Sequence, residues 1–281
     1  MTTASDTDTE DQQERADMST AAATAAVSPA AGHVYSNAFY DYIDQGARRS
    51  AQAMISVLQP WLNSRSVLDL GSGRGVWLKE WQDDGVEDVV GVDGDYVDRS
   101  RLAIAPERFH AADLTRPFDL GRRFDLAQSL EVGEHLPRAA SATLVDSLTR
   151  HADRVLFSAA VTGQGGEFHV NEQPLSFWQD LFAERGYSAF DCARPMLAGM
   201  EGVEPWYRYN TILYVNAAGR TGLPRAVLDT EIPAGTPVPL AGSLGWRMRR
   251  GVVTLMPRSM VTGIAKTRAA IIARQARRGL A

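Results

Sequence analysis

Two carboxylates and two histidines are the residues of this sequence whose types and spacing best suit chemistry. Glu131, Glu134 and His135 lie within five residues of one another, just after a short apolar run. His169 follows later, in a segment that begins with two glycines. Carboxylate oxygens and imidazole nitrogens together suit Mg²⁺, Mn²⁺ or Fe²⁺. The four residues are therefore a candidate site for a divalent metal, which would orient substrate oxygens and lower the pKa of a hydroxyl group.

Two other interpretations of these residues remain open at this point. His169, His135 and Glu131 are candidate catalytic residues, and His169 could act as a general base without a metal because imidazole titrates near neutral pH. Alternatively, the residues could have structural roles only, in which they would cap the following helix and line a pocket. Dependence of activity on a divalent ion would separate the first interpretation from the other two.

A glycine-rich turn is the second candidate site. The apolar run of residues 66–70 contains Asp69 and leads directly into Gly71, Gly73 and Gly75. Glycine tolerates a positive φ and lets a ligand approach the backbone where a Cβ atom would block it. The helix expected after the turn would offer free backbone N–H groups to an anionic part of a ligand. The spacing is G-x-G-x-G and differs from the G-x-G-x-x-G of dinucleotide-binding proteins.

Two acidic residues beyond this turn suit the recognition of a nucleoside. Asp93 follows the next apolar run, 18 residues after Gly75, and its carboxylate could accept both hydroxyls of a ribose. Asp113 lies in a later loop, where it could accept from the amino group of an adenine. An ordinary turn with solvated acidic residues is the alternative.

From about Tyr35 to Val215, the sequence that carries these residues resembles the class I S-adenosylmethionine-dependent methyltransferases. The resemblance implies that the glycines lie beside the methionine part of S-adenosylmethionine, and that Asp93 binds its ribose. It also implies that Asp113 and the Leu114 backbone bind the adenine. The cofactor-binding residues expected on this basis are Asp69, Gly71, Ser72, Gly73, Gly75, Asp93, Gly94, Asp113, Leu114 and Ser129.

The carboxylate–histidine cluster carries a narrower resemblance. Its E-x-x-E-H pattern with a later histidine is similar to that of metal-dependent O-methyltransferases, namely the ubiquinone-pathway enzymes and the small-RNA 3′-terminal 2′-O-methyltransferases. This implies that Glu131, Glu134, His135 and His169 bind Mg²⁺, or Mn²⁺ or Fe²⁺ in its place. The favoured function is O-methylation of a small molecule such as a secondary metabolite, a phenol or a sugar. The alternatives are an RNA ribose 2′-O-methyltransferase and a protein that binds S-adenosylmethionine or S-adenosylhomocysteine without transferring a methyl group.

Short apolar runs alternate with amphipathic stretches, which predicts an α/β fold with a doubly wound parallel sheet. The resemblance further implies a Rossmann-like seven-stranded sheet, mostly parallel, with helices on both faces and an antiparallel last strand at residues 211–215. The predicted strands are residues 66–70, 88–92, 124–129, 154–158 and 211–215. The predicted helices include residues 51–62, 76–81, 138–150 and 174–185.

Composition divides the chain into three parts. Residues 1–32 are acidic and lack large apolar side chains, so they are expected to be disordered. Residues 33–218 form the expected methyltransferase domain, and residues 219–281 form an expected extended linker and basic, partly helical tail. Residues 245–281 contain nine basic and no acidic residues, whereas residues 32–244 carry nine more acidic than basic residues. Such an acidic body argues against a broad contact with nucleic acid.

The basic tail contains a predicted amphipathic helix over residues 259–278, with its apolar side chains on one broad side. Such a helix could pack on its own chain, on a second subunit in a homodimer, or on an anionic membrane surface. Docking on protein is favoured, because the body offers opposite charge and the apolar side lacks Trp and Phe.

Further features bear on the cellular setting and on the acceptor. No apolar run is long enough to span a membrane, and the N-terminus lacks the features of a secretory signal, so a cytoplasmic location is expected. Cys192 is the single cysteine, which excludes an internal disulfide and favours a buried apolar role. Residues that could line a pocket for the methyl acceptor, or pack in the core instead, are Tyr35, Phe39, Tyr40, Trp178, Trp206, Tyr207 and Arg208.

Overall fold

The structure is a computed structural model that describes residues 37–257, 260–264, 267 and 271, with the backbone alone for residues 37–43. The chain divides into two units, residues 1–36 and 37–281. The segment 1–32, which is expected to be disordered, and the pocket candidate Tyr35 lie outside the described residues. The side chains of Phe39 and Tyr40 lie outside them as well.

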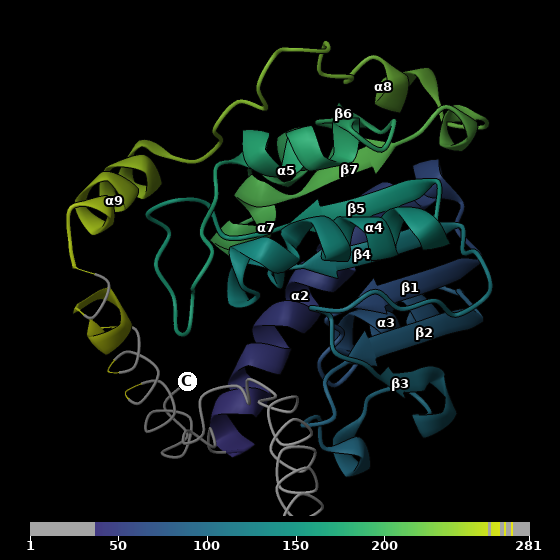
Figure 1. The fold of residues 1–281 in the computed structure, drawn as a ribbon, viewed down its shortest axis with the longest axis horizontal. Helices are drawn as coiled ribbons and strands as arrows, with labels where there is room; N and C mark the ends of the chain where they lie inside the picture. Colours follow the sequence, from purple (N-terminus) through teal and green to yellow (C-terminus); the bar gives the residue numbers. More distant parts are fainter. Residues whose placement is uncertain (1–36, 258–259, 265–266, 268–270, 272–281) are drawn as a thin grey trace, which may run out of the picture. The chain divides into compact units, whose positions relative to one another are not determined.

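A seven-stranded sheet forms the centre of the second unit (Figure 1). Its strands lie in the order β3-β2-β1-β4-β5-β7-β6. β7 runs antiparallel to both of its neighbours, and the other pairs are parallel. The predicted α/β sheet with an antiparallel last strand is thereby confirmed. The strands are β1 (Ser66–Leu70), β2 (Asp88–Asp93), β3 (Phe109–Ala111), β4 (Leu126–Leu130), β5 (Arg154–Ser158), β6 (Ser188–Phe190) and β7 (Ile212–Val215).

Helices cover both faces of this sheet. Side chains of α2, α3, α6 and α7 share one apolar core with the sheet, and side chains of α4 and α5 share the other. Along β5, Leu156 belongs to the first core, whereas Val155 and Phe157 belong to the second, as the alternation of side chains in a strand requires. The helices are α2 (Asn37–Leu62), α3 (Val76–Asp83), α4 (Ser141–His151), α5 (Leu175–Ala183), α6 (Ala193–Leu197), α7 (Pro205–Asn210), α8 (Arg225–Leu228) and α9 (Leu244–Thr254).

The region after β7 is more structured than an extended linker. It contains α8 and a bridge from Glu231 to Phe190 of β6, and α9 follows. Within the described residues, no helix is both long enough and apolar enough to cross a membrane. Cys192 is buried in the core, where burial raises the pKa of its thiol to about 12, so the predicted apolar role is confirmed.

Candidate active site

The carboxyl ends of four parallel strands bring the predicted site residues to one edge of the sheet (Figure 1). β1 leads into Gly71, β2 ends at Asp93, β4 leads into Glu131, and β5 leads into the loop that carries His169. Open α/β sheets bind ligands at this edge, next to the point where the strand order reverses. In this sheet the reversal lies between β1 and β4.

The glycine-rich turn after β1 has a backbone that only glycine adopts readily. Gly71, Gly73 and Gly75 have φ values of 85°, 53° and 78°. A Cβ atom on Gly71 would lie 2.3 Å from Cγ2 of Val132, so a larger residue does not fit there. A Cβ atom on Gly73 would meet nothing within 4 Å, which means that space beside this residue is open to a ligand.

Asp93 ties the end of β2 to the glycine-rich turn. Its buried carboxylate accepts hydrogen bonds from the backbone N–H groups of Gly73 and Gly94, each at 2.7 Å. The hydroxyl of Tyr96 donates to Oδ1 of the same carboxylate at 2.6 Å. The hydroxyl of Tyr96 therefore occupies a position that the resemblance assigns to a ribose hydroxyl of the cofactor. Tyr96 has no role in the sequence-based prediction, because an exposed tyrosine three residues after the acid gives no local signal.

Asp69 is a buried acid directly before the turn. It pairs in register with Gly91 of β2 and Gln128 of β4, so its backbone lies in the middle of the sheet. Burial raises the pKa of Asp69 to about 7, and the nearby Asp93 raises it too, although a hydrogen bond with Gln128 acts in the opposite direction. Asp69 therefore keeps its proton to a much higher pH than a free aspartate does.

The other residues that are predicted to bind cofactor also lie near this edge. Ser72 in the turn and Ser129 on β4 are buried, and their hydroxyls have no hydrogen-bond partner in the described structure. Asp113 follows β3, where Oδ1 accepts from the N–H and hydroxyl of Thr115, and Leu114 beside it is buried. Two unpartnered hydroxyls and an open glycine turn fit a ligand with several polar groups, such as S-adenosylmethionine.

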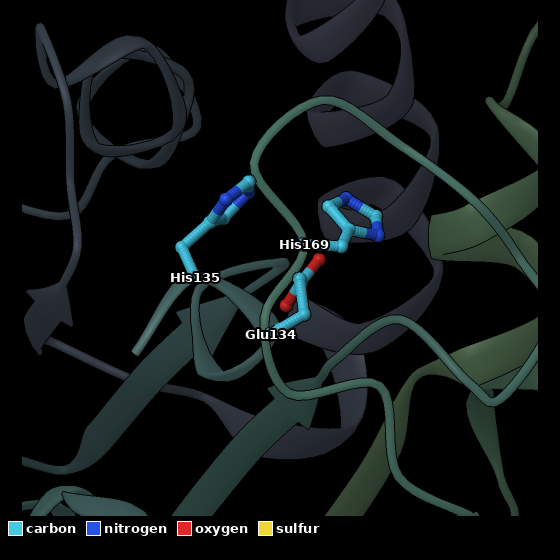
Figure 2. A group of neighbouring side chains, drawn as sticks. All are labelled: Glu134, His135 and His169. Carbon is cyan, nitrogen blue, oxygen red and sulfur yellow. The ribbon is translucent and has the colours of Figure 1, made fainter. Parts of the chain in front are cut away.

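Three of the four predicted metal ligands converge in space. Glu134, His135 and His169 each offer one ligand atom, and these three atoms lie within 4.8 Å of one another (Figure 2). Glu134 and His135 belong to the helical turn Gly133–His135 after β4, and His169 lies in the loop after β5. The imidazole rings of His135 and His169 meet edge to face, with 5.0 Å between their centroids.

Glu131 lies next to these three residues rather than among them. Its carboxylate adjoins that of Glu134, and Nε2 of Gln164 donates to its Oε2 at 3.0 Å. Gln164 is fixed in turn, because its Oε1 accepts from Nδ2 of Asn210 at 2.8 Å. Glu131 has a φ of 58°, which is unusual for a residue other than glycine and is common at functional sites. Its Oε1 is buried without a hydrogen-bond partner in the described structure.

Hydrogen bonds join the loop of His169 to the turn that carries Glu134. The backbone carbonyl of Glu134 accepts from the N–H groups of Val170 at 2.9 Å and Asn171 at 3.0 Å. The buried side chain of Asn171 donates to the carbonyl of Gly133 at 3.0 Å. The two segments that supply the metal-ligand candidates are therefore positioned against each other by backbone groups.

Glu172 orients the His169 ring. Its Oε1 lies 2.8 Å from Nδ1 of His169 and accepts from the N–H of Gly165 at 2.7 Å, and its Oε2 accepts from the N–H of Gly163 at 2.9 Å. Burial alone would raise the pKa of Glu172, but the hydrogen bonds from His169 and from the two amides outweigh it, and the pKa is lowered. An ionised Glu172 keeps the proton of the imidazole on Nδ1 and leaves Nε2 free to accept. The sequence-based prediction did not include Glu172, because it lies in a loop, where sequence spacing does not predict which side chains meet.

The surrounding protein sets the protonation of the remaining groups. Burial raises the pKa of Glu131 and raises that of Glu134 well above its usual range, the latter with a further contribution from the adjacent Glu131. His135 is exposed at the surface, but the protein packed around its ring and the nearby His169 both lower its pKa. His135 is therefore a neutral imidazole at physiological pH, as a metal ligand must be.

These observations fit a divalent cation. Oε2 of Glu134 is buried without a hydrogen-bond partner in the described structure, His135 is neutral, and His169 has a carboxylate on its other nitrogen. Buried carboxyl groups with raised pKa values and unpartnered oxygens are stabilised when a cation joins them. The donor set of oxygen and imidazole suits Mg²⁺, Mn²⁺ or Fe²⁺.

Some of the residues that could line an acceptor pocket are buried in the core, and others are partly exposed. Trp178 is 1% exposed and packs on Phe157 in the apolar core, so its alternative role in packing is the correct one. Tyr207 is buried and meets Trp77 edge to face at 5.0 Å. Trp206 and Arg208 are partly exposed beside it on α7.

Comparison with known proteins decides the family. Residues 36–189 match the family model described as "Methyltransferase domain", which covers more than half of the chain. The chain belongs to this family. Together with the seven-stranded sheet, this identifies it as an S-adenosylmethionine-dependent methyltransferase of the class I fold. None of the curated proteins matches the chain.

Three solved structures are similar to this chain at low sequence identity. The sugar N-methyltransferase KedS8 from Streptoalloteichus sp ATCC 53650 is 16% identical, with a TM-score of 0.51 over 69% of this chain and 98% of that chain. DesVI from Streptomyces venezuelae is 16% identical, with a TM-score of 0.49 over 66% of this chain and 100% of that chain. The methyltransferase domain of bacterial CtHen1-C is 19% identical, with a TM-score of 0.44 over 61% of this chain and 98% of that chain.

Proposed function

We propose that this methyltransferase methylates a hydroxyl group of a small molecule, with a divalent metal bound by Glu134, His135 and His169. The convergence of these three side chains within 4.8 Å, at the sheet edge that also holds the glycine-rich turn, carries the proposal. When bound, S-adenosylmethionine supplies the methyl group, and the ion orients the acceptor oxygens and lowers the pKa of the hydroxyl. The acidic balance of residues 32–244 favours a small acceptor over RNA.

Each residue of the site has a separate task in this proposal. Glu134 must lose its proton before it can bind a cation, because burial raises its pKa. Metal affinity should therefore fall as the pH falls. Glu172 holds His169 in the tautomer whose Nε2 is free, and Gln164 holds the Glu131 carboxylate beside Glu134.

A metal-free mechanism is the second candidate, and the pair of Glu172 and His169 favours it. In that case Nε2 of His169 would take the proton of the acceptor hydroxyl, and bound S-adenosylmethionine would supply the methyl group and leave as S-adenosylhomocysteine. Glu172 then stabilises the imidazolium through Nδ1, at the observed 2.8 Å.

Metal dependence tests the proposal. The enzyme is freed of divalent ions by chelation and offered S-adenosylmethionine with a panel of catechols, phenols and sugars, and methylated product is detected by mass spectrometry. We expect no product until Mg²⁺ or Mn²⁺ is restored. Binding of Mn²⁺ to the protein alone, followed by calorimetry, should be lost in Glu134→Gln and His169→Ala. It should be kept in Glu184→Gln, whose carboxylate is exposed.

The two mechanisms give opposite results in this experiment. Full activity after exhaustive chelation, together with no Mn²⁺ binding, would refute the metal site and leave His169 as the base. If N-methylated or C-methylated product formed instead of O-methylated product, the proposed acceptor would be wrong while the metal site could still be assessed by Mn²⁺ binding.

A further inference from the structure

The apolar side of α9 faces solvent. Its residues Leu244, Met248, Val252 and Leu255 are 74%, 64%, 61% and 87% exposed. At about 100° per residue, these four positions fall within an arc of about 80° around the helix axis. A surface helix normally turns such an apolar stripe towards the core of its own domain. We call these four residues the α9 stripe.

Contacts on the opposite side of α9 fix this orientation. The guanidinium group of Arg249 donates to the carbonyl of Gln164 at 2.9 Å, and that of Arg250 donates to the carbonyl of Thr162 at 2.7 Å. Both acceptors lie in the loop after β5, next to which α9 appears in Figure 1. On the same side, the ring of Trp246 packs against that of Tyr209, with 5.7 Å between their centroids. Polar and apolar contacts therefore hold this side of α9 to the protein, and the α9 stripe is left on the outer side.

The chain beyond α9 also has exposed apolar side chains. Met260, Ile264 and Ile271 are also more than half exposed. Residues 245–281 contain nine basic and no acidic residues, and Arg247 lies on the exposed part of α9 beside the stripe. Exposed apolar side chains with flanking arginines are typical of helices that lie in the surface of an anionic bilayer. The sequence favours docking on protein, either the same chain or a partner, and at these three positions the apolar side chains face solvent.

We propose that the α9 stripe binds the surface of an anionic lipid bilayer. The four side chains would enter the boundary between headgroups and acyl chains, and the arginines would contact lipid phosphates. A second copy of the chain fits the stripe less well. Four side chains bury about 100 Å² each, which is roughly half of the 800 Å² per partner that stable interfaces bury.

Sedimentation of the full chain with vesicles tests this proposal. The chain is mixed with vesicles of phosphatidylcholine alone, or of phosphatidylcholine and phosphatidylglycerol in equal amounts. We expect sedimentation with the anionic vesicles only. The double variant Met248→Glu/Val252→Glu should bind more weakly by roughly tenfold or more, because charged groups replace the apolar ones.

A matched control separates insertion of the stripe from simple attraction between charges. Met196→Glu introduces one glutamate at another exposed methionine, on α6, and is compared with the single variant Met248→Glu. Met196→Glu should bind like the unmodified chain, and Met248→Glu should bind more weakly. Thermal melting shows that each variant folds. Equal binding of the double variant and the unmodified chain, or no binding of the full chain to anionic vesicles, would overturn the proposal. A lipid-free dimer that the double variant dissociates, without vesicle binding by the unmodified chain, would assign the stripe to a second copy instead.

Discussion

Replacing Glu172 with glutamine tests whether this residue prepares His169 for chemistry. The variant keeps the size of the side chain and removes its charge. In the structure, the Glu172 carboxylate accepts from two backbone amides and from Nδ1 of His169. Glutamine has one acceptor oxygen, and its NH₂ group would face a donor. We therefore expect His169 to lose its fixed tautomer.

The size of the effect follows from the hydrogen bonds that are lost. A hydrogen bond to a charged group contributes about 1.5–3 kcal/mol. Loss of about 2 kcal/mol at the His169 contact corresponds to roughly a 30-fold decrease in kcat/KM or in metal affinity. This lies within the roughly 10–100-fold range seen when the partner of a ligating histidine is removed.

Stability should respond as well, with a definite dependence on pH. The pKa of Glu172 is lowered in the folded state, so its ionised form stabilises the fold above the pKa of the unfolded chain. This contribution is lost as the pH falls through the folded-state pKa. Glu172→Gln should therefore be less stable than the unmodified protein at neutral pH, and the difference should shrink in acid.

Steady-state rates of S-adenosylhomocysteine formation, Mn²⁺ calorimetry and urea unfolding at several pH values measure these effects. Glu184→Gln is the control, because it removes an exposed carboxylate and should change none of them. If Glu172→Gln changed kcat/KM and Mn²⁺ affinity by less than about twofold, the orienting role of Glu172 would be refuted.

Two further predictions concern Asp93 and Asp69, which are predicted to bind the cofactor. Asp93→Ala should weaken binding of S-adenosylmethionine by roughly tenfold to a hundredfold, because a charged acceptor of several hydrogen bonds is lost, and an unchanged dissociation constant in calorimetry would contradict this role. Asp69 has a folded-state pKa of about 7 against 3.8 for the free acid, so the free energy of unfolding should fall as the pH rises from 4 to 7. In urea unfolding, the free energy of unfolding of Asp69→Asn should decrease less between pH 4 and pH 7, by at most about 4 kcal/mol. If the free energies of the two proteins changed with pH in parallel, the raised pKa of Asp69 would be refuted.

Buried apolar runs made much of the fold predictable from the sequence. β1 and β5 begin and end at the predicted residues, since nearly every side chain in them is buried between two helical layers. β3 and β6 have three residues each, and so short a segment shows no period. The helix α8 in the expected linker has four residues and is equally difficult to predict.

The candidate site was predictable where residue type alone points to chemistry. Glycines, acids and histidines after successive strands indicate one sheet edge, because parallel strands end together. The partners of those residues were not predictable. Gln164 contacts Glu131 across 33 residues of sequence, and Asn210 contacts Gln164 across 46. The sequence also could not show whether Trp178 lines a pocket or packs in the core, because an aromatic residue near a site motif has the same local pattern in both cases.

The position of β7 in the sheet has a consequence for synthesis and for truncation. β6 precedes β7 in sequence, yet in the sheet it lies beyond β7 and reaches β5 only through it. A nascent chain can therefore join the first five strands early, but β6 has no strand to pair with until residue 215 has left the ribosome. The residues that match the family model, 36–189, end inside β6 and lack β7. A fragment cut to those bounds would expose an unpaired edge on β5, and such edges promote aggregation.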